Sequence, residues 1–125
     1  MFVDPATAGV SAGHIFVHHA APSDSDGPMR RFADFWEVTA VTAKRVWAAR
    51  TLTETVEEIP DPDGVFYGGR LIRPIAGRHD ERTLSLMRVS VESQGKPVLH
   101  LPRRHCAWIS MTDTWDKSPQ FVHPN

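Results

Sequence analysis

The chain has 125 residues, a length typical of one domain, and its apolar fraction of 41% supports a modest core. The charged residues sum to a net charge of −1, which excludes a uniformly basic nucleic-acid-binding protein and a wholly acidic protein. A single cysteine excludes an internal disulfide framework, and no apolar run has the length of a membrane span. Residues 1–12 lack a signal-peptide pattern, so we expect one soluble domain in the cytoplasm.

The predicted elements are short strands separated by turns. Strands are predicted, in chain order, at residues 14–18, 35–41, 46–53, 70–75, 83–91, 98–101 and 107–111. Aromatic and β-branched residues mark the second strand, and four residues separate it from the third, which predicts a hairpin with a short loop. A turn is predicted at residues 93–97, where Gly and Pro stand between two apolar runs. We expect flexible ends at residues 1–12 and 120–125, and loops at residues 20–31 and 57–64.

Short strands, frequent turns and the lack of a long amphipathic pattern predict a mostly β fold. The form expected is a small single-domain SH3-like barrel or a strongly bent antiparallel sheet with irregular N- and C-terminal segments. A helix within residues 34–52 is the alternative, because alanine and arginine favour helices. Charge is uneven, since residues 1–63 hold five basic and ten acidic side chains and residues 64–125 hold nine and five. This predicts either a basic face drawn from the second half or two halves that neutralise each other.

Seven histidines suggest a metal site, but their spacing matches no tight ligand pattern. His18 and His19 are adjacent and would face opposite sides of a strand, whereas His100, His105 and Cys106 could be brought together by a turn. We expect no metal and no cofactor, although metal-dependent activity through that second group is an alternative. Basic neighbours would favour a Cys106 thiolate, but no oriented base can be identified. We therefore expect a small core residue there, and no enzyme.

The more promising group is aromatic and cationic, since tryptophan is over-used and arginine dominates the basic residues. One arginine side chain can bind two phosphate oxygens at once, and tryptophan rings stack on bases or cations. The competing interpretation is that two or three of the tryptophans belong to the core and the arginines line a solvated face. The candidate ligand- or partner-binding residues are Trp36, Trp47, Arg50, Arg70, Arg73, Arg88, Arg103, Arg104, His105 and Trp108.

Three motifs follow one another along the chain: GHIF at 13–16, DFWEVTAVTAKRV at 34–46 and WDKSP at 115–119. In these motifs the chain resembles a group of small phage- and plasmid-borne proteins that read roughly GDIFY, DFYxVxxVTxKxV and WDGxP. It departs from them where His14 replaces Asp, where Ser118 stands for a Gly one residue late, and at residues 108–114, which look inserted. The resemblance covers most of the chain, is dense over 34–50, and implies a compact β-rich accessory protein made inside a bacterium. We expect the shared motif to be a folding signature.

Together these features predict a non-enzymatic accessory protein of a phage or plasmid that binds a component of its bacterial host. Two mechanisms fit: occluding a protein complex as a counter-defence inhibitor, or sequestering a small phosphorylated ligand between protomers of a homo-oligomer. A structural component of a virion or oligomeric scaffold is one alternative. A nucleic-acid-binding small β-barrel is another, with a basic strip made of Arg70, Arg73, Arg88, Arg103 and Arg104.

Overall fold

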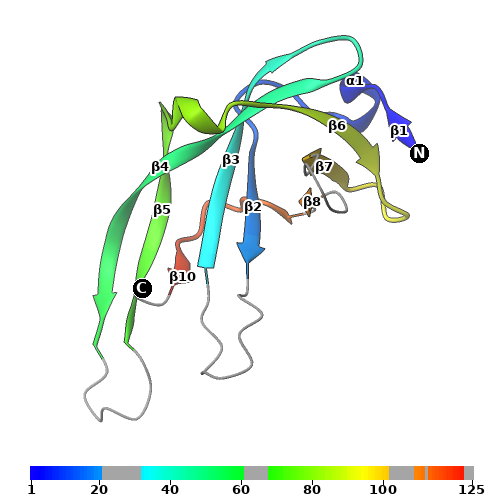
Figure 1. The fold of residues 1–125 in the computed structure, drawn as a ribbon. Helices are drawn as coiled ribbons and strands as arrows, with labels where there is room; N and C mark the ends of the chain where they lie inside the picture. The colour runs from blue at the N-terminus through cyan, green and yellow to red at the C-terminus, as the bar shows by residue number, and fades with distance from the viewer. Residues whose placement is uncertain (21–31, 61–67, 102–108, 112, 123–125) are drawn as a thin grey trace.

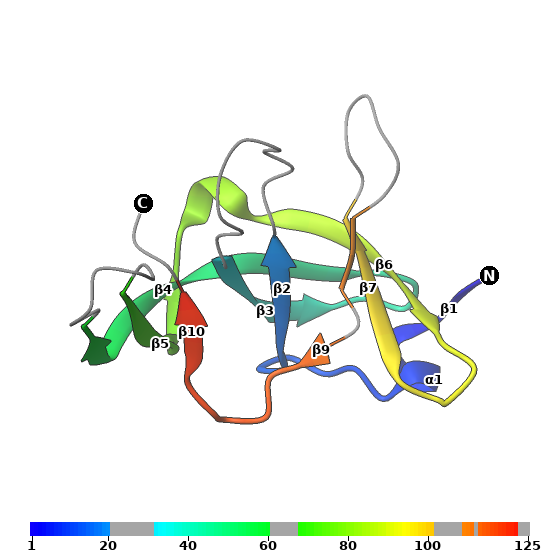
Figure 2. The same ribbon diagram turned by 90° about the horizontal axis from the view of Figure 1, so that it is seen from below.

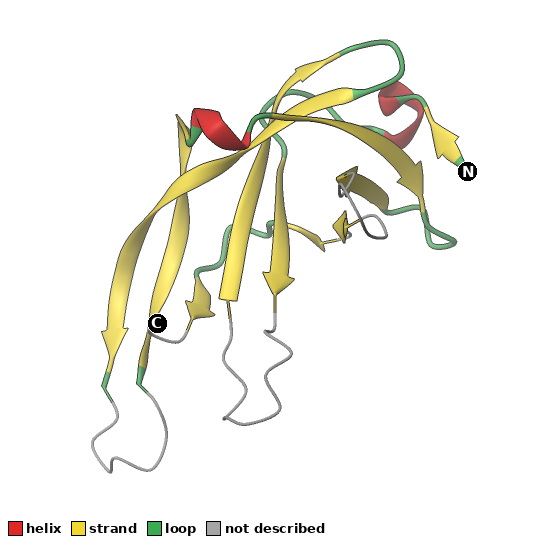
Figure 3. Ribbon diagram, viewed as in Figure 1, coloured by secondary structure: helices red, strands yellow, loops and turns green. Residues whose placement is uncertain are grey.

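The computed structural model describes residues 1–20, 32–60, 68–101, 109–111 and 113–122, and these are mostly β (Figure 1, Figure 3). Two short helices interrupt the strands, α1 (Pro5–Ala8) and the 3-10 helix η1 (Glu81–Thr83). The strands are β1 (Phe2–Val3), β2 (Ile15–Ala20), β3 (Phe32–Val41), β4 (Val46–Ile59), β5 (Gly69–His79), β6 (Ser85–Val91), β7 (Pro97–Leu101), β8 (Ile109–Met111), β9 (Asp113–Thr114) and β10 (Gln120–Val122).

The strands form one strongly bent antiparallel network. Its main path runs β8-β7-β6-β4-β3-β2-β9, with β1 beside β6, β5 beside β4, and β10 beside β5. Among the described residues the path is open, because β8 and β9 form its two ends and are not paired with each other. The predicted mostly β, antiparallel fold is confirmed, and the bent sheet is the form observed. The alternative of a helix within residues 34–52 is wrong.

The predicted hairpin is present, with residues 42–45 between β3 and β4. Its turn is closed by Thr42, whose N–H donates to the Arg45 carbonyl at 2.8 Å and whose Oγ1 accepts from the Arg45 N–H at 3.0 Å. Both strands are longer than predicted. β3 starts at Phe32 because its first residues pair with β2, and β4 continues to Ile59 because it pairs with β5. Residues 57–59, predicted in a loop, are therefore strand.

The chain ends, expected as flexible and irregular, carry regular structure where they are described. β1 pairs with β6, α1 follows it, and β10 pairs with β5. Residue 20 belongs to β2 rather than to the predicted loop at 20–31, because it pairs with the start of β3. The predicted turn at 93–97 is confirmed, and its last residue already opens β7. The other residues of the loop at 20–31, and residues 61–64, lie outside the described residues.

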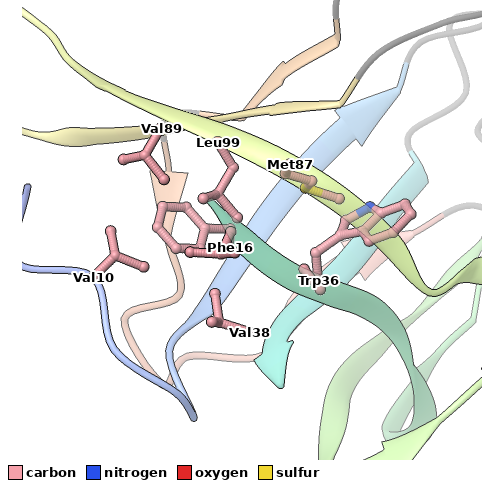
Figure 4. Close-up of a cluster of buried hydrophobic side chains, with 9 residues drawn as sticks. Val10, Phe16, Trp36, Val38, Met87, Val89 and Leu99 are labelled. Carbon is pink, nitrogen blue, oxygen red and sulfur yellow. The ribbon is translucent and has the colours of Figure 1, made fainter. Parts of the chain in front are cut away.

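Over their central residues, 15–17 and 35–38, β2 and β3 are buried on both faces, and each face belongs to a different hydrophobic cluster. On one face, Ile15 and Phe35 pack in a cluster with Ile72 of β5 and Val122 of β10. Because side chains alternate along a strand, neighbouring residues serve opposite faces, which explains why IFV at 15–17 and FW at 35–36 are apolar without alternation. The cluster on the other face is drawn in Figure 4 and consists of Val10, Phe16, Trp36, Val38, Val46, Ala48, Met87, Val89 and Leu99.

A bulge at residues 75–78 interrupts the pairing of β5 with β4. Within it, Gly77 has a φ of 79°, a conformation that favours glycine. Its N–H donates to Glu37 Oε1 on β3 at 3.0 Å, and His79 Nε2 contacts the same oxygen. Glu37 is only 7% exposed, so the bulge supplies the partners that a buried carboxylate requires.

The WDKSP motif forms a turn that packs on the cluster of Phe35, Ile72 and Val122. The Trp115 ring meets Phe35 edge-on with centroids 6.0 Å apart, and its Nε1–H donates to the Ser118 carbonyl at 2.8 Å. Asp116 Oδ1 accepts from the Ser118 N–H at 2.9 Å, and Lys117 between them has a φ of 77°. This left-handed conformation favours glycine, and in the pattern WDGxP the glycine falls at Lys117 rather than at Ser118. These contacts hold residues 115–118 together and place Trp115 against Phe35.

Candidate functional site

A cleft of about 440 Å³ is lined by residues from the β3–β4 turn, from β6 and from β1 with the residue after it. The turn lies near β1 and β6 in both ribbon views (Figure 1, Figure 2). Three of the side chains that line the cleft are cationic and one is a carboxylate. None of the three cations forms an ion pair with any described residue. We call it the basic cleft, and its lining residues are Phe2, Val3, Asp4, Lys44, Arg45 and Arg88.

Strand alternation places Arg88 in the basic cleft. Its neighbours Met87 and Val89 are buried in the core, so Arg88 points to the opposite face of β6. Phe2 of β1 is paired with Ser90, two residues further along β6, and reaches the same face. There the guanidinium carbon of Arg88 lies 4.8 Å from the centre of the Phe2 ring, a cation–π contact.

The other two cations come from the β3–β4 turn. Lys44 and Arg45 are exposed, and the bonds between Thr42 and Arg45 fix the turn that carries them. A side chain on a closed turn loses less conformational freedom on binding than one on a flexible segment. The turn therefore presents two positive charges to the cleft from a defined position.

His100 borders this region without adding to its charge. It is paired with Arg88 across β6 and β7, its ring meets Phe2 edge-on at 5.3 Å, and its Nε2 lies 2.6 Å from Ser90 Oγ. Burial lowers the pKa of His100 below the usual 6.5, and the positive amino terminus lowers this pKa further. The ring is therefore neutral at pH 7.

A second cleft, of about 570 Å³, opens where β4 leaves β3. The two strands pair as far as Trp36 and Arg50, after which β4 pairs with β5 instead. A cleft on one face of a sheet is lined by alternate residues of a strand. Here consecutive residues of β3 and of β4 line the gap, so its walls are the edges of these two strands. We call it the fork cleft, and it is lined by Phe32, Ala33, Asp34, Arg50, Thr51, Leu52, Thr53, Arg70, Ile72, Ile75, Asp80 and Val122.

The charges of the fork cleft are balanced, with two cations and two carboxylates. Arg50 lies 3.7 Å from Asp34. A hydrogen bond from the Arg82 side chain is the main cause that lowers the pKa of Asp80, and the charge of Arg50 also lowers it. Thr51 Oγ1 is buried with no hydrogen-bond partner among the described atoms. A cleft of this composition attracts an anion less than the basic cleft does.

For three of the predicted candidates, packing or a neighbouring charge within the fold explains the residue without a ligand. Trp36 is 7% exposed within the core, so it is removed from the ligand-contact candidates. We call the paired segments 53–59 of β4 and 69–74 of β5 the arm. Arg73 donates to Glu54 on this arm, and Arg70 stands opposite Glu58. Cross-strand neighbours of opposite charge stabilise a sheet, so Arg73 has a partner within the fold and Arg70 has an acidic residue opposite it.

Three of the described candidates line a cleft, and Trp47 lines neither of the two. Arg50 and Arg70 line the fork cleft, and Arg88 lines the basic cleft. Trp47 is 37% exposed and lies on the outer face of β4. The predicted basic strip is therefore not formed by its described members, because two arginines lie on β5 and the third lines the other cleft. Four candidates and the thiol lie outside the described residues: Arg103, Arg104, His105, Trp108 and Cys106.

Three residues of the basic cleft were missed as candidates. Lys44 and Arg45 fall in the predicted hairpin loop, and the position of two cations on a loop was a signal that the sequence offered. Phe2 carried no such signal, because it lies in a segment predicted as a flexible end. Only the pairing of β1 with β6 brings it to Arg88.

Within the described part of the chain, no group of three or more His, Cys, Asp or Glu residues is placed to hold a metal ion. None of the helices described has the length and apolar character needed to cross a membrane. No family model, curated protein or solved structure matches the chain. The residues of the two clefts are therefore the basis on which a function is inferred.

Proposed function

We propose that the chain is a non-enzymatic binding protein whose basic cleft holds a phosphate-bearing ligand. The observation that carries this is the charge of the cleft, where Lys44, Arg45 and Arg88 face one carboxylate, Asp4. Cations held close together repel one another, and a ligand with several anionic oxygens relieves this repulsion and accepts charge-assisted hydrogen bonds. A phosphate ester or a polyphosphate has this chemistry.

The resemblance to phage- and plasmid-borne proteins supports a wider proposal. Thr42 and Lys44 occupy the Thr and Lys of the pattern VTxKxV. Thr42 closes the hairpin turn, and Lys44 lines the basic cleft. We extend the proposal to a mobile-element protein that works in the bacterial cytoplasm and sequesters a phosphorylated host ligand as a counter-defence.

Calorimetric titration with tripolyphosphate at low salt tests the basic cleft. The double variant Arg45→Gln with Arg88→Gln is expected to weaken binding at least tenfold, because each charge-assisted hydrogen bond contributes roughly 1.5–3 kcal/mol. Arg45 is exposed on the turn and Arg88 is half-buried on the face of β6 away from the core, so circular dichroism should show an unchanged fold. Higher salt should weaken binding to the wild-type chain.

The matched control is Arg73→Gln, which also removes positive charge but from the arm, where Arg73 donates to Glu54. This variant is expected to bind tripolyphosphate as the wild type does. Equal weakening by Arg73→Gln would show a general effect of net charge and would overturn the assignment to the basic cleft. So would the lack of any binding to the wild-type chain at low salt.

A protein partner is the second candidate, and the fork cleft favours it. Strand edges without a neighbour bind extended peptides, and β4 also exposes Leu52 and Val56, each 46% accessible. A photocrosslinking residue at either position should capture the same host protein, whereas one at Lys96, in the exposed turn before β7, should not. Identical products from all three positions would reject this candidate.

A further inference from the structure

An aromatic and cationic row on the outer face of β6 extends beyond the basic cleft. Trp47 of β4 is paired with Leu86, and Phe2 of β1 is paired with Ser90. Leu86, Arg88 and Ser90 are alternate residues of β6, so their partners share the face on which Arg88 lies. Trp47 and Phe2 are 37% and 40% exposed, and both rings therefore offer surface to a ligand.

Trp47 is placed to act together with the cations of the cleft. Arg45 stands immediately before β4 and lines the same cleft as Arg88, and Trp47 shares the face on which Arg88 lies. Along β6, the position opposite Trp47 is two residues from Arg88, a distance of about 7 Å. An aromatic ring with cations at this separation matches a ligand that has an aromatic group joined to phosphates by a short spacer.

The hydrophobic clusters do not account for the position of Trp47. Trp36 belongs to the cluster drawn in Figure 4 and Trp115 packs on the cluster around Phe35, whereas Trp47 is a member of neither. An indole that is not buried, and that adjoins a group of cations, is typical of surfaces that stack nucleobases.

We propose that the ligand of the basic cleft is a nucleoside phosphate, with its base stacked on Trp47 and its phosphates bound by Lys44, Arg45 and Arg88. This inference rests on the proposed function and adds the base to it. A free nucleotide and a nucleotide within a single strand share this chemistry. Stacking tolerates any base, so the proposal includes no preference among bases.

The experiment compares ATP without magnesium to tripolyphosphate, by calorimetric titration at one salt concentration. Charge alone would give tripolyphosphate equal or tighter binding, because it carries at least as many charges as ATP. Base stacking is expected to make ATP bind roughly 5- to 100-fold tighter. Trp47→Leu should remove that difference and leave the affinity for tripolyphosphate unchanged, while Trp47→Phe should retain most of the difference.

The outcomes separate this inference from the proposed function. If the wild-type chain binds neither compound, both are overturned. If it binds both with equal affinity, or if Trp47→Leu leaves the preference for ATP intact, the base-stacking inference is overturned and the proposed function stands. If Trp47→Leu also abolishes binding of tripolyphosphate, which has no base, the indole shapes the cleft. That result would count against base stacking.

A third titration distinguishes the two sources of the nucleotide. A ten-residue oligothymidylate should bind more tightly than ATP, and with a steeper salt dependence, if the site takes a single strand, because each additional phosphate contact releases counterions. Equal or weaker binding of the oligonucleotide identifies a free nucleotide. In both cases Trp47→Leu should lower the affinity for the nucleotide ligand by the factor found for ATP.

Discussion

Replacing Glu37 by methionine is expected to lower the free energy of unfolding by about 3 kcal/mol. One oxygen of this buried carboxylate accepts from the Gly77 N–H at 3.0 Å and contacts His79 Nε2. Hydrogen bonds to a charged group contribute about 1.5–3 kcal/mol each. We take the lower end for both, because Gly77 is exposed and His79 is partly exposed, so water replaces some of what is lost.

Two further variants separate the carboxylate's charge from its geometry. Glu37→Gln keeps an acceptor for Gly77 and should cost only about 1 kcal/mol. Glu54→Gln breaks an exposed ion pair with Arg73, and such pairs contribute about 0–1 kcal/mol. Urea denaturation measures all three variants, and hydrogen exchange at Gly77 should become faster in the methionine variant. If Glu37→Met costs no more than Glu54→Gln, the bulge of β5 is held by something other than this carboxylate.

Three other predictions concern single residues. Lys117→Gly should raise the free energy of unfolding by about 0.5 kcal/mol because glycine relieves the left-handed strain, whereas Lys117→Ala should not; equal effects would refute the strain. Gly69→Ala should cost about 2 kcal/mol in urea denaturation, since a Cβ would lie 2.4 Å from the Val122 carbonyl oxygen; an unchanged midpoint would show that β10 moves aside. Because the pKa of His100 is lowered on folding, the unfolded chain binds more protons, and stability should decrease as pH falls below about 6.5. His100→Gln should reduce this decrease, as measured by denaturation at several pH values, and a parallel profile would contradict it.

Local sequence predicted the hairpin well, because the Phe-Trp-Glu-Val run and the four residues after Val41 determine a strand and a turn without help from distant segments. Distant pairing produced the features that were missed. β4 reaches Ile59 because β5 lies beside it, although Glu57 and Glu58 alone suggest a loop. β1 and β10 form because β6 and β5 offer them an edge, which no local pattern of two or three residues can indicate.

The candidate site was predicted in part, for the same reason. Residue type identified Trp47 and Arg88 as candidates, and strand register places their side chains on one face. Residue type also identified Trp36, but a strand that is buried on both faces directs this indole into the core. Phe2 lines the basic cleft because β1 pairs with β6, which lies far from it in the sequence. Only the folded structure shows this pairing.

The burial of β2 and β3 on both faces limits how this protein can change in evolution. Most strands in a bent sheet have one side that accepts polar replacements, but Phe16, Trp36 and Phe35 leave these two strands with none over their central residues. Variation should therefore accumulate in the turn residues, the arm and the cleft linings, where ligand preference can be altered without loss of the fold. Related chains are expected to keep the central strands nearly constant while diverging in what they bind.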